Sequence, residues 1–171
     1  MRATAILVGL TASATAHANS PPYAGEAPLR PALEADVGLS VIGLGYEHPV
    51  AAHVSVGAMA GITSTYFSPW FDQGDRTDGY VLGVRATWFA RATGRGPYIA
   101  PFLRGARITT DAESGAGLGV AAGAFVGWAW RVGRQVDIRA GVGGQYMDYR
   151  VRGTGIDAPF IALDGVIAYR L

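Results

Sequence analysis

Long stretches of the chain alternate between apolar and polar residues. Residues 80–90, YVLGVRATWFA, show this most clearly: the even positions are Tyr, Leu, Val, Ala and Trp, and the intervening odd positions include Gly, Arg and Thr. A period of two is typical of a β-strand with one face in an apolar environment. The same alternation fits a soluble sheet with its apolar face inward and a membrane barrel with that face outward.

Seven stretches follow this period, and they predict seven strands. They lie at about 33–46, 53–66, 79–91, 97–109, 117–131, 135–149 and 159–171. Each is at least as long as the ~9 to 11 residues that a tilted transmembrane strand needs. Strands of soluble proteins average only about 5 to 6 residues, so the lengths favour a membrane barrel.

The connections between these stretches alternate in length. EHPVAA, ATGRGP and VGR are short, whereas SPWFDQGDRTDG, TDAESGA and RVRGTGIDAP are longer and more polar. Transmembrane barrels show this asymmetry, with tight periplasmic turns and longer outer loops. We therefore expect the three longer connections to lie together at the outer end.

The two faces of the predicted strands differ in composition. One face is aliphatic and aromatic, and it includes Leu33, Val41, Val84 and Leu118; the other mixes charged and hydroxyl residues with glycines. Glycines weaken strands for no gain on a solvated face, but in a narrow lumen they leave room for long Arg side chains. We therefore assign the polar face to the lumen and the apolar face to lipid.

Aromatic residues occur at two levels of the predicted barrel. Tyr66, Tyr80 and Tyr146 are next to the longer connections, and Trp88, Trp128, Trp130 and Tyr169 are near the opposite end. From Tyr80 to Trp88 the chain rises roughly 20 Å, close to the ~25 Å apolar band of an outer-membrane barrel. The sequence thus predicts an all-β fold, an antiparallel up-and-down transmembrane β-barrel.

The N-terminal sequence predicts export. Residues 1–18 combine Arg2, an uncharged apolar stretch and Ala16-His17-Ala18, which is the pattern of a cleaved signal peptide. Residues 19–32 are rich in Pro and small residues and predict an irregular arm, and residues 33–171 form the barrel. The formal charge of +1 argues against a nucleic-acid partner, and the absence of Cys excludes disulfides and thiolate sites.

At this point the chain resembles the small outer-membrane β-barrels of Gram-negative bacteria, the OmpA-type, OmpX-type and opacity-protein group. The resemblance covers about residues 33–171 and includes the terminal strand FIALDGVIAYRL, which looks like the C-terminal assembly signal of that group. It implies an outer-membrane location, contact with outer-membrane lipid and lipopolysaccharide, folding by the barrel assembly machinery, and a monomer. The chain departs from the group at Leu171, where Phe is usual.

The strand count is the second departure. Bacterial single-chain barrels have an even number of strands, from eight upward, whereas seven strands are visible in the pattern. We expect eight strands, with the first formed by residues 20–31. Pro28 and Pro31 are tolerated there because prolines occur at strand starts and edges.

The charged residues of the polar face are the main candidate site. They are Glu34, Asp36, Asp137 and Asp164, together with Arg85, Arg104, Arg139 and Arg170. An eight-stranded barrel is just wide enough for side chains to fill it, and an unpaired charge inside would be costly. We expect a salt-bridge network that plugs the lumen, with a conducting path as the alternative.

A second candidate is the pair His53 and Ser55, which lie on one face of a predicted strand. A His-x-Ser pair resembles the catalytic motif of outer-membrane lipid A deacylases, in which Ser is the nucleophile and His its base. The sequence offers no third group to orient the His, so we expect turn and lumen residues rather than an enzyme. Glu47, His48 and His53 are too few for a metal site, and we expect no metal or other cofactor.

The longer connections carry the remaining candidates. Trp70, Phe71, Arg150 and Arg152 could form a binding patch, because Trp and Arg are enriched in binding hot spots; they fit interface anchors and solvated loops equally well. The sequence therefore predicts an outer-membrane barrel with a plugged polar lumen and a structural or surface-interaction role. The alternatives are a lipid A-modifying enzyme and a soluble periplasmic barrel that binds a small apolar ligand.

Overall fold

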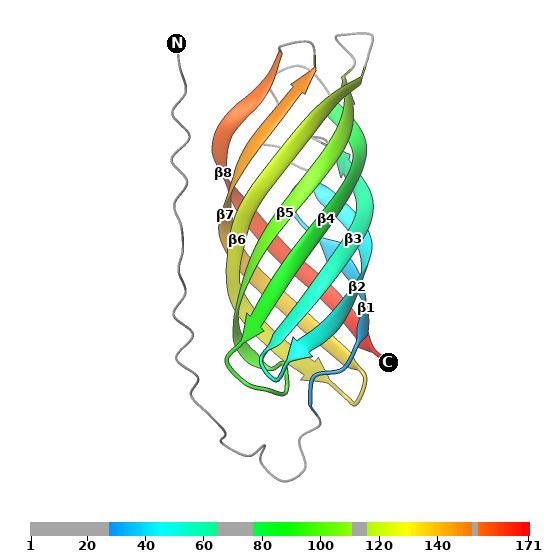
Figure 1. Ribbon diagram of the computed structural model, residues 1–171, viewed down its shortest axis with the longest axis vertical. Coiled ribbons are helices and arrows are strands. Elements are labelled where there is room, and N and C mark those ends of the chain that lie inside the picture. Colours follow the sequence, from blue (N-terminus) through cyan, green and yellow to red (C-terminus); the bar gives the residue numbers. More distant parts are fainter. Residues whose placement is uncertain (1–27, 65–76, 111–115, 152–153) are drawn as a thin grey trace.

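The computed structural model describes residues 28–64, 77–110, 116–151 and 154–171. These residues form eight strands: β1 (Ala32–Val37), β2 (Val41–Ala51), β3 (Val54–Ser64), β4 (Thr77–Phe89), β5 (Gly96–Thr110), β6 (Ala116–Val132), β7 (Val136–Val151) and β8 (Thr154–Arg170). Each strand pairs antiparallel with its neighbours in sequence, and β1 pairs with β8, which closes the barrel (Figure 1). The predicted eight-stranded up-and-down barrel is confirmed.

None of the described residues belongs to a helix that could cross a membrane. The predicted signal peptide and residues 19–27 of the predicted arm lie outside the described residues, as does Tyr66. We call the end of the barrel where β8 finishes the lower end and the opposite end the upper end, as they stand in Figure 1.

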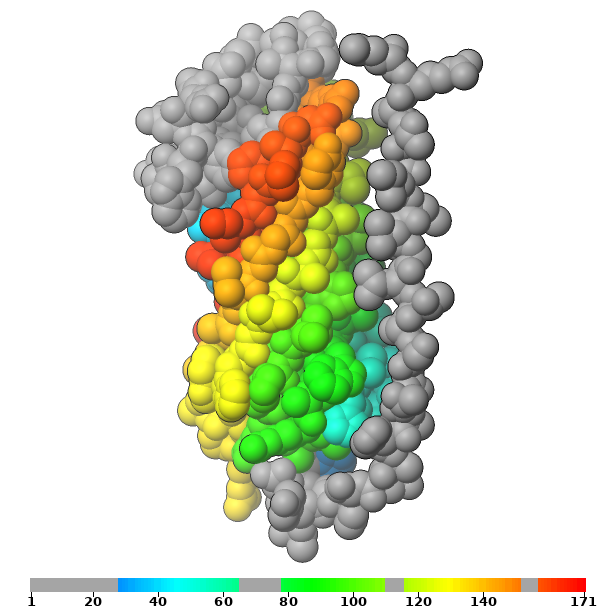
Figure 2. All heavy atoms as spheres, turned by 90° about the vertical axis from the view of Figure 1, so that its left-hand side faces the viewer, coloured from blue at the N-terminus to red at the C-terminus, as the bar shows by residue number. Residues whose placement is uncertain are grey.

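The strands are strongly tilted against the barrel axis. Following the paired residues once around the barrel from Tyr169 leads back to β8 at Pro159, a shift of 10 residues (169 to 159). For eight strands this shift corresponds to a tilt of about 40°. Figure 2 shows the consequence, with β4 to β8 running diagonally across the face in view.

Side chains alternate strictly between the lumen and the outer surface. On β4, Val81 is 1% exposed whereas Leu82 is 68% exposed. The outward residues of every strand are mainly aliphatic or aromatic, while the charged residues of the lower half point inward. The predicted alternation therefore holds along the strands, with the apolar face outside.

The eighth strand comes from a place other than the predicted one. Residues 33–46, predicted as one strand, form a hairpin: β1 and β2 are joined by residues 38–40, and Gly38 N–H donates to Val41 O at 2.8 Å. Residues 28–31 are in no strand, residues 20–27 lie outside the described residues, and the barrel closes without them. The prediction that residues 20–31 supply a strand is wrong.

The hairpin also reverses the faces that we predicted for β2. Residues at odd positions point outward on β1, but after the turn the even positions do, so Val41 is buried in the lumen instead of facing lipid. Val37 pairs with Ile42, and the four residues between these partners change the parity, so every later side chain of β2 lies on the face opposite to the predicted one.

The prediction of a third long outer connection is also wrong. β7 extends to Val151 and β8 begins at Thr154, so most of RVRGTGIDAP belongs to paired strands. The polar residues of this segment lie in strands because β7 and β8 stay paired beyond the apolar part of the barrel wall, up to Val151 and Thr154. Of the other two predicted long connections, residues 68–79 and 110–116, the parts at 68–76 and 111–115 lie outside the described residues, and the remainder belongs to β4, β5 and β6.

Candidate functional site

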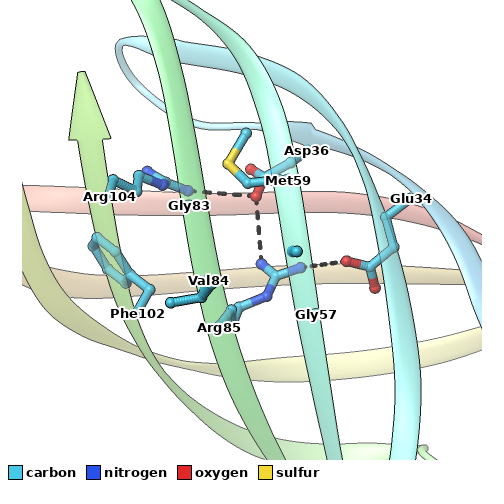
Figure 3. Close-up of a pocket in the computed structure, with 10 residues that line it drawn as sticks. Glu34, Asp36, Gly57, Met59, Gly83, Val84, Arg85, Phe102 and Arg104 are labelled. Carbon is cyan, nitrogen blue, oxygen red and sulfur yellow. Dashed lines mark hydrogen bonds and ion pairs between the residues drawn. The ribbon is translucent and has the colours of Figure 1, made fainter. Parts of the chain in front are cut away.

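Arg85 is the centre of a charged cluster in the middle of the lumen. Its guanidinium donates to Glu34 Oε2 at 2.8 Å and to Asp164 Oδ1 at 2.9 Å, and it lies 3.5 Å from Asp36 Oδ2. Arg104 donates to the same Asp36 oxygen at 3.4 Å. Figure 3 shows how the side chains of β1, β4 and β5 converge on this point.

A second cluster lies below the first and is linked to it by Arg139. This arginine donates to Glu34 in the upper cluster and to Glu47 at 2.8 Å in the lower one. Arg170 donates to Glu47 at 3.0 Å and to Asp137 at 2.6 Å. Asp137 also accepts a hydrogen bond from Arg131 Nε at 2.7 Å. The ion pairs therefore form one continuous network.

We call this set the lumen network. It joins five carboxylates and five guanidinium groups: Glu34, Asp36, Glu47, Asp137 and Asp164 with Arg85, Arg104, Arg131, Arg139 and Arg170. The charges balance, which is what burial requires, because an uncompensated charge in a low-dielectric interior is strongly destabilising. The structure brings together all eight residues that the sequence had singled out.

Sequence reasoning missed Glu47, Arg131 and Tyr98. Glu47 was placed on a turn because the β1–β2 hairpin was not recognised; once β2 begins at Val41, Glu47 falls on its inward parity. Arg131 shares the parity of the β6 glycines, and the glycine-bearing face is the one predicted to line the lumen. Both could have been found from the alternation alone. Tyr98 donates to Asp164 Oδ2 at 2.5 Å, and the pattern gave no signal for that bond.

Glycines on the inward face make room for large side chains that project from nearby strands. A Cβ at either Gly127 or Gly141 would lie 2.6 Å from the hydroxyl oxygen of Tyr98, and a Cβ at Gly119 would lie 2.3 Å from Tyr149. At Gly83 the nearest atom belongs to Arg104, 3.0 Å away. The glycines thus accommodate tyrosines as well as the arginines that we expected.

The upper half of the lumen is mainly apolar, which corrects the prediction of a polar lumen throughout. Arg104 marks the boundary: its guanidinium stacks over the Phe102 ring at 4.6 Å and also faces Phe125. Above it, aliphatic and aromatic side chains fill the interior: Val41, Val81, Ala106, Ile108, Ala121, Met147, Tyr149 and Val151. The charges are confined to the lower half because their partners on β1, β2 and β8 lie there.

The lower mouth of the barrel is closed by residues 28–31. Leu29 is buried in a cluster with Phe89 and Tyr98, and its N–H donates to Ala92 O at 3.2 Å. Arg170 donates to Arg30 O at 2.7 Å. This segment therefore seals the lumen below the lumen network.

The lumen contains little free space. A cavity between Glu34, Asp36, Arg85 and Arg104 has a volume of about 10 Å³ (Figure 3). By the same measure a single water molecule needs about 10 to 15 Å³. The interior beside Arg85 and Arg104 is therefore closely packed.

His53 and Ser55 do not form a nucleophile–base pair. His53 Nδ1 lies 3.0 Å from Phe89 O, and the Ser55 hydroxyl, fully buried in the lumen, has no hydrogen-bond partner among the described residues. No three His, Asp or Glu side chains within the described part of the chain are grouped as metal ligands. Glu47 points into the lumen and His48 outward, which separates them.

The predicted loop patch can be described only at Arg150. This exposed side chain donates to Asp148 Oδ1 at 2.7 Å and to Asp157 Oδ2 at 2.5 Å, on the outer surface of β7 and β8. Trp70, Phe71 and the Arg152 side chain lie outside the described residues. Arg150 is therefore already neutralised by neighbouring carboxylates.

Comparison with known proteins identifies no relative of this chain. The chain matches no protein-family model, no curated protein and no solved structure.

Proposed function

We propose that this protein is an integral outer-membrane β-barrel with a plugged lumen and a structural or surface-interaction role. The observation that carries the proposal is the outer wall, which is apolar on every strand and bounded by aromatic residues at two levels. Trp88, Trp128 and Trp130 are each nearly half exposed on this wall. In water such a surface would be an extensive hydrophobic patch, whereas in lipid it is the expected one.

The two aromatic levels fit the thickness of a membrane. With a tilt of about 40°, each residue along a strand rises about 2.5 Å, and each step to the next strand rises about 3 Å. On this basis Tyr80 and Tyr146 lie at the same height, within about 1 Å. Roughly 18 to 24 Å below them are four further aromatic side chains, close to the ~25 Å apolar band of such barrels: Trp88, Trp128, Trp130 and Tyr169.

Charge on the outer wall supports the same assignment. Among the described residues, no Asp, Glu or Arg points outward between the two aromatic levels. Asp148 and Arg150 are on the outer surface, but beyond the level of Tyr146 on the same strand. Charged side chains on a lipid-facing wall are destabilising in proportion to their depth, and here they are confined to the ends.

The proposed role follows from how the lumen is filled. The lumen network, the apolar upper half and Leu29 together fill the barrel, so we propose that the protein is a membrane anchor or surface-interaction protein rather than a pore. The partners that we propose are outer-membrane lipid, including lipopolysaccharide, and the assembly machinery during biogenesis, with the protein itself a monomer.

Neither rival function has a specific observation in its favour. A lipid A-modifying enzyme of the predicted kind needs Ser55 and His53 at a lipid-facing groove, but Ser55 is buried inside the lumen. A soluble barrel with an apolar ligand needs the Trp-bearing face inside, but Trp88 and Trp128 point outward.

Fractionation followed by gel electrophoresis tests the proposal. Cells expressing the full chain are separated into periplasmic, inner-membrane and outer-membrane fractions, and the last is run with and without boiling. We expect the protein in the outer membrane, with a band that shifts on heating. A periplasmic protein whose band does not shift would contradict the proposal.

A further inference from the structure

The lower end of the barrel carries exposed arginines on three neighbouring segments. They are Arg30 on the segment that closes the lumen, Arg91 on the β4–β5 turn and Arg134 on the β6–β7 turn. Hydrogen bonds link the segments: Leu29 N–H donates to Ala92 O at 3.2 Å, and the guanidinium of Arg131, near the end of β6, donates to Thr93 O at 2.8 Å. We call Arg30, Arg91 and Arg134 the arginine ring.

The described residues do not neutralise the arginine ring. In the part of the chain that the structure describes, no carboxylate forms an ion pair with any of the three. The acidic side chains nearest this end, Glu47 and Asp137, are each 1% exposed and bound within the lumen network. At the upper end, by contrast, Arg150 is paired with Asp148 and Asp157. The lower end thus exposes three arginines that have no acidic partner in the described part of the chain.

The position of the arginine ring relative to the tryptophans indicates what it contacts. Arg91 follows Trp88 by three residues and Arg134 follows Trp130 by four, on the side away from the apolar band. These spacings place the guanidinium groups within about 10 Å of the tryptophan level. Because tryptophans lie at the membrane–water interface and headgroups occupy the next ~5 to 8 Å, this is the depth of lipid phosphates.

We propose that the arginine ring binds the phosphate groups of anionic phospholipids in the leaflet around the lower end. Guanidinium groups suit this role because they form paired hydrogen bonds with phosphate oxygens. A cation near an anionic membrane surface contributes about 1 kcal/mol, equivalent to an approximately five-fold preference for an anionic over a zwitterionic lipid. The inference rests on the proposed membrane location and adds a lipid class and its binding residues.

Tryptophan quenching by brominated lipids tests this directly, because Trp88, Trp128 and Trp130 adjoin the arginine ring. The full chain carrying Trp70→Phe, which removes emission from outside the described residues, is folded into phosphatidylcholine vesicles that contain 30% phosphatidylglycerol. Bromine is placed near the headgroup of one lipid or the other. We expect brominated phosphatidylglycerol to compete for the protein surface about five-fold better than brominated phosphatidylcholine.

The variants separate charge at the arginine ring from charge elsewhere. Replacing Arg30, Arg91 and Arg134 together by Gln should lower the preference for phosphatidylglycerol over phosphatidylcholine from about five-fold to about one. The same positions changed to Lys should retain part of it, and Arg107→Gln, at an exposed cation of the upper end, should leave it unchanged. These side chains are exposed, and the heat-shifted band verifies folding of each variant.

Each negative result of this experiment leads to a different conclusion. Equal quenching by both lipids in an inserted, heat-shifted protein would overturn the inference and leave the proposed function standing. No quenching by either lipid and no heat shift would overturn the proposed function itself. A preference that survives the Gln variant, or binding to an acidic cell-wall polymer without any lipid preference, would also overturn the assignment to phospholipid.

Discussion

At the scale of single residues, the lumen is held together by side chains that are remote in sequence. Glu34 binds Arg85, 51 positions away, and Arg139, 105 positions away. Each of these charges is buried, so each depends on the others for compensation. Removal of one member leaves its partners in an apolar interior without water to replace it.

Replacing Arg85 by Ala should therefore destabilise the barrel by about 3 to 5 kcal/mol. Glu34, Asp36 and Asp164 would all lose a cation. Urea unfolding in lipid vesicles measures the loss, with the exposed Arg107→Ala as control. A vesicle-swelling assay on the same variant should show no added solute flux, because Leu29 and the apolar upper half still close the lumen; increased flux would contradict a plugged barrel.

The inward glycines permit a second test at this scale. In Gly127→Ala the new Cβ would lie 2.4 Å from Ala140 O and 2.6 Å from the Tyr98 hydroxyl. Such overpacking typically costs about 1 to 3 kcal/mol. Gly105→Ala is the matched control, since nothing lies within 4 Å of its Cβ position. Chemical denaturation should separate the two variants, and equal unfolding free energies would count against the packing described.

At the scale of elements, two short pieces decide how the barrel closes. The β1–β2 hairpin supplies the missing strand, and residues 28–31 cap the lower mouth. Gly94, with a φ of +74°, lies directly under Leu29: a Cβ there would be 2.5 Å from Leu29 Cδ2. The β4–β5 turn is thus shaped to receive the capping segment.

Leu29→Ala should open the lower mouth without unfolding the barrel. The chain has no Cys, so Thr93→Cys provides a single thiol next to Gly94, at a side chain only 4% exposed. A membrane-impermeant maleimide added to detergent-solubilised protein should label this Cys readily when Leu29 is replaced and slowly when it is present. Leu33→Ala, an outward position on β1, is the control. Equal labelling rates in all three backgrounds would mean that Leu29 does not cap the lumen.

At the scale of the whole molecule, the inside and the outside are inverted relative to a water-soluble barrel. Charges lie in the lower lumen, hydrocarbon side chains cover the outer wall, and aromatic rings mark two levels on that wall. The effect of an outward substitution on stability should therefore depend on its position along the barrel axis as much as on its chemistry.

Two outward leucines test that dependence. Leu44, near the middle of the apolar band, and Leu118, above the level of Tyr146, are 73% and 78% exposed. In vesicles, Leu44→Arg should lower the unfolding free energy by about 2 to 4 kcal/mol and Leu118→Arg by about 0 to 1 kcal/mol. In a soluble barrel both changes would be close to neutral, so an equal small effect would argue against insertion.

The sequence by itself determined the fold class, the outward face of most strands and eight members of the lumen network, because a period of two assigns each side chain to one face. It did not locate the β1–β2 hairpin, since residues 33–46 continue the alternation closely enough to read as one strand. Nor did it reveal the capping role of Leu29, the bond between Tyr98 and Asp164, or the division of the lumen into a charged lower and an apolar upper half. Those features depend on which strands meet across the barrel and at what height, and only closure with a shift of 10 residues decides that.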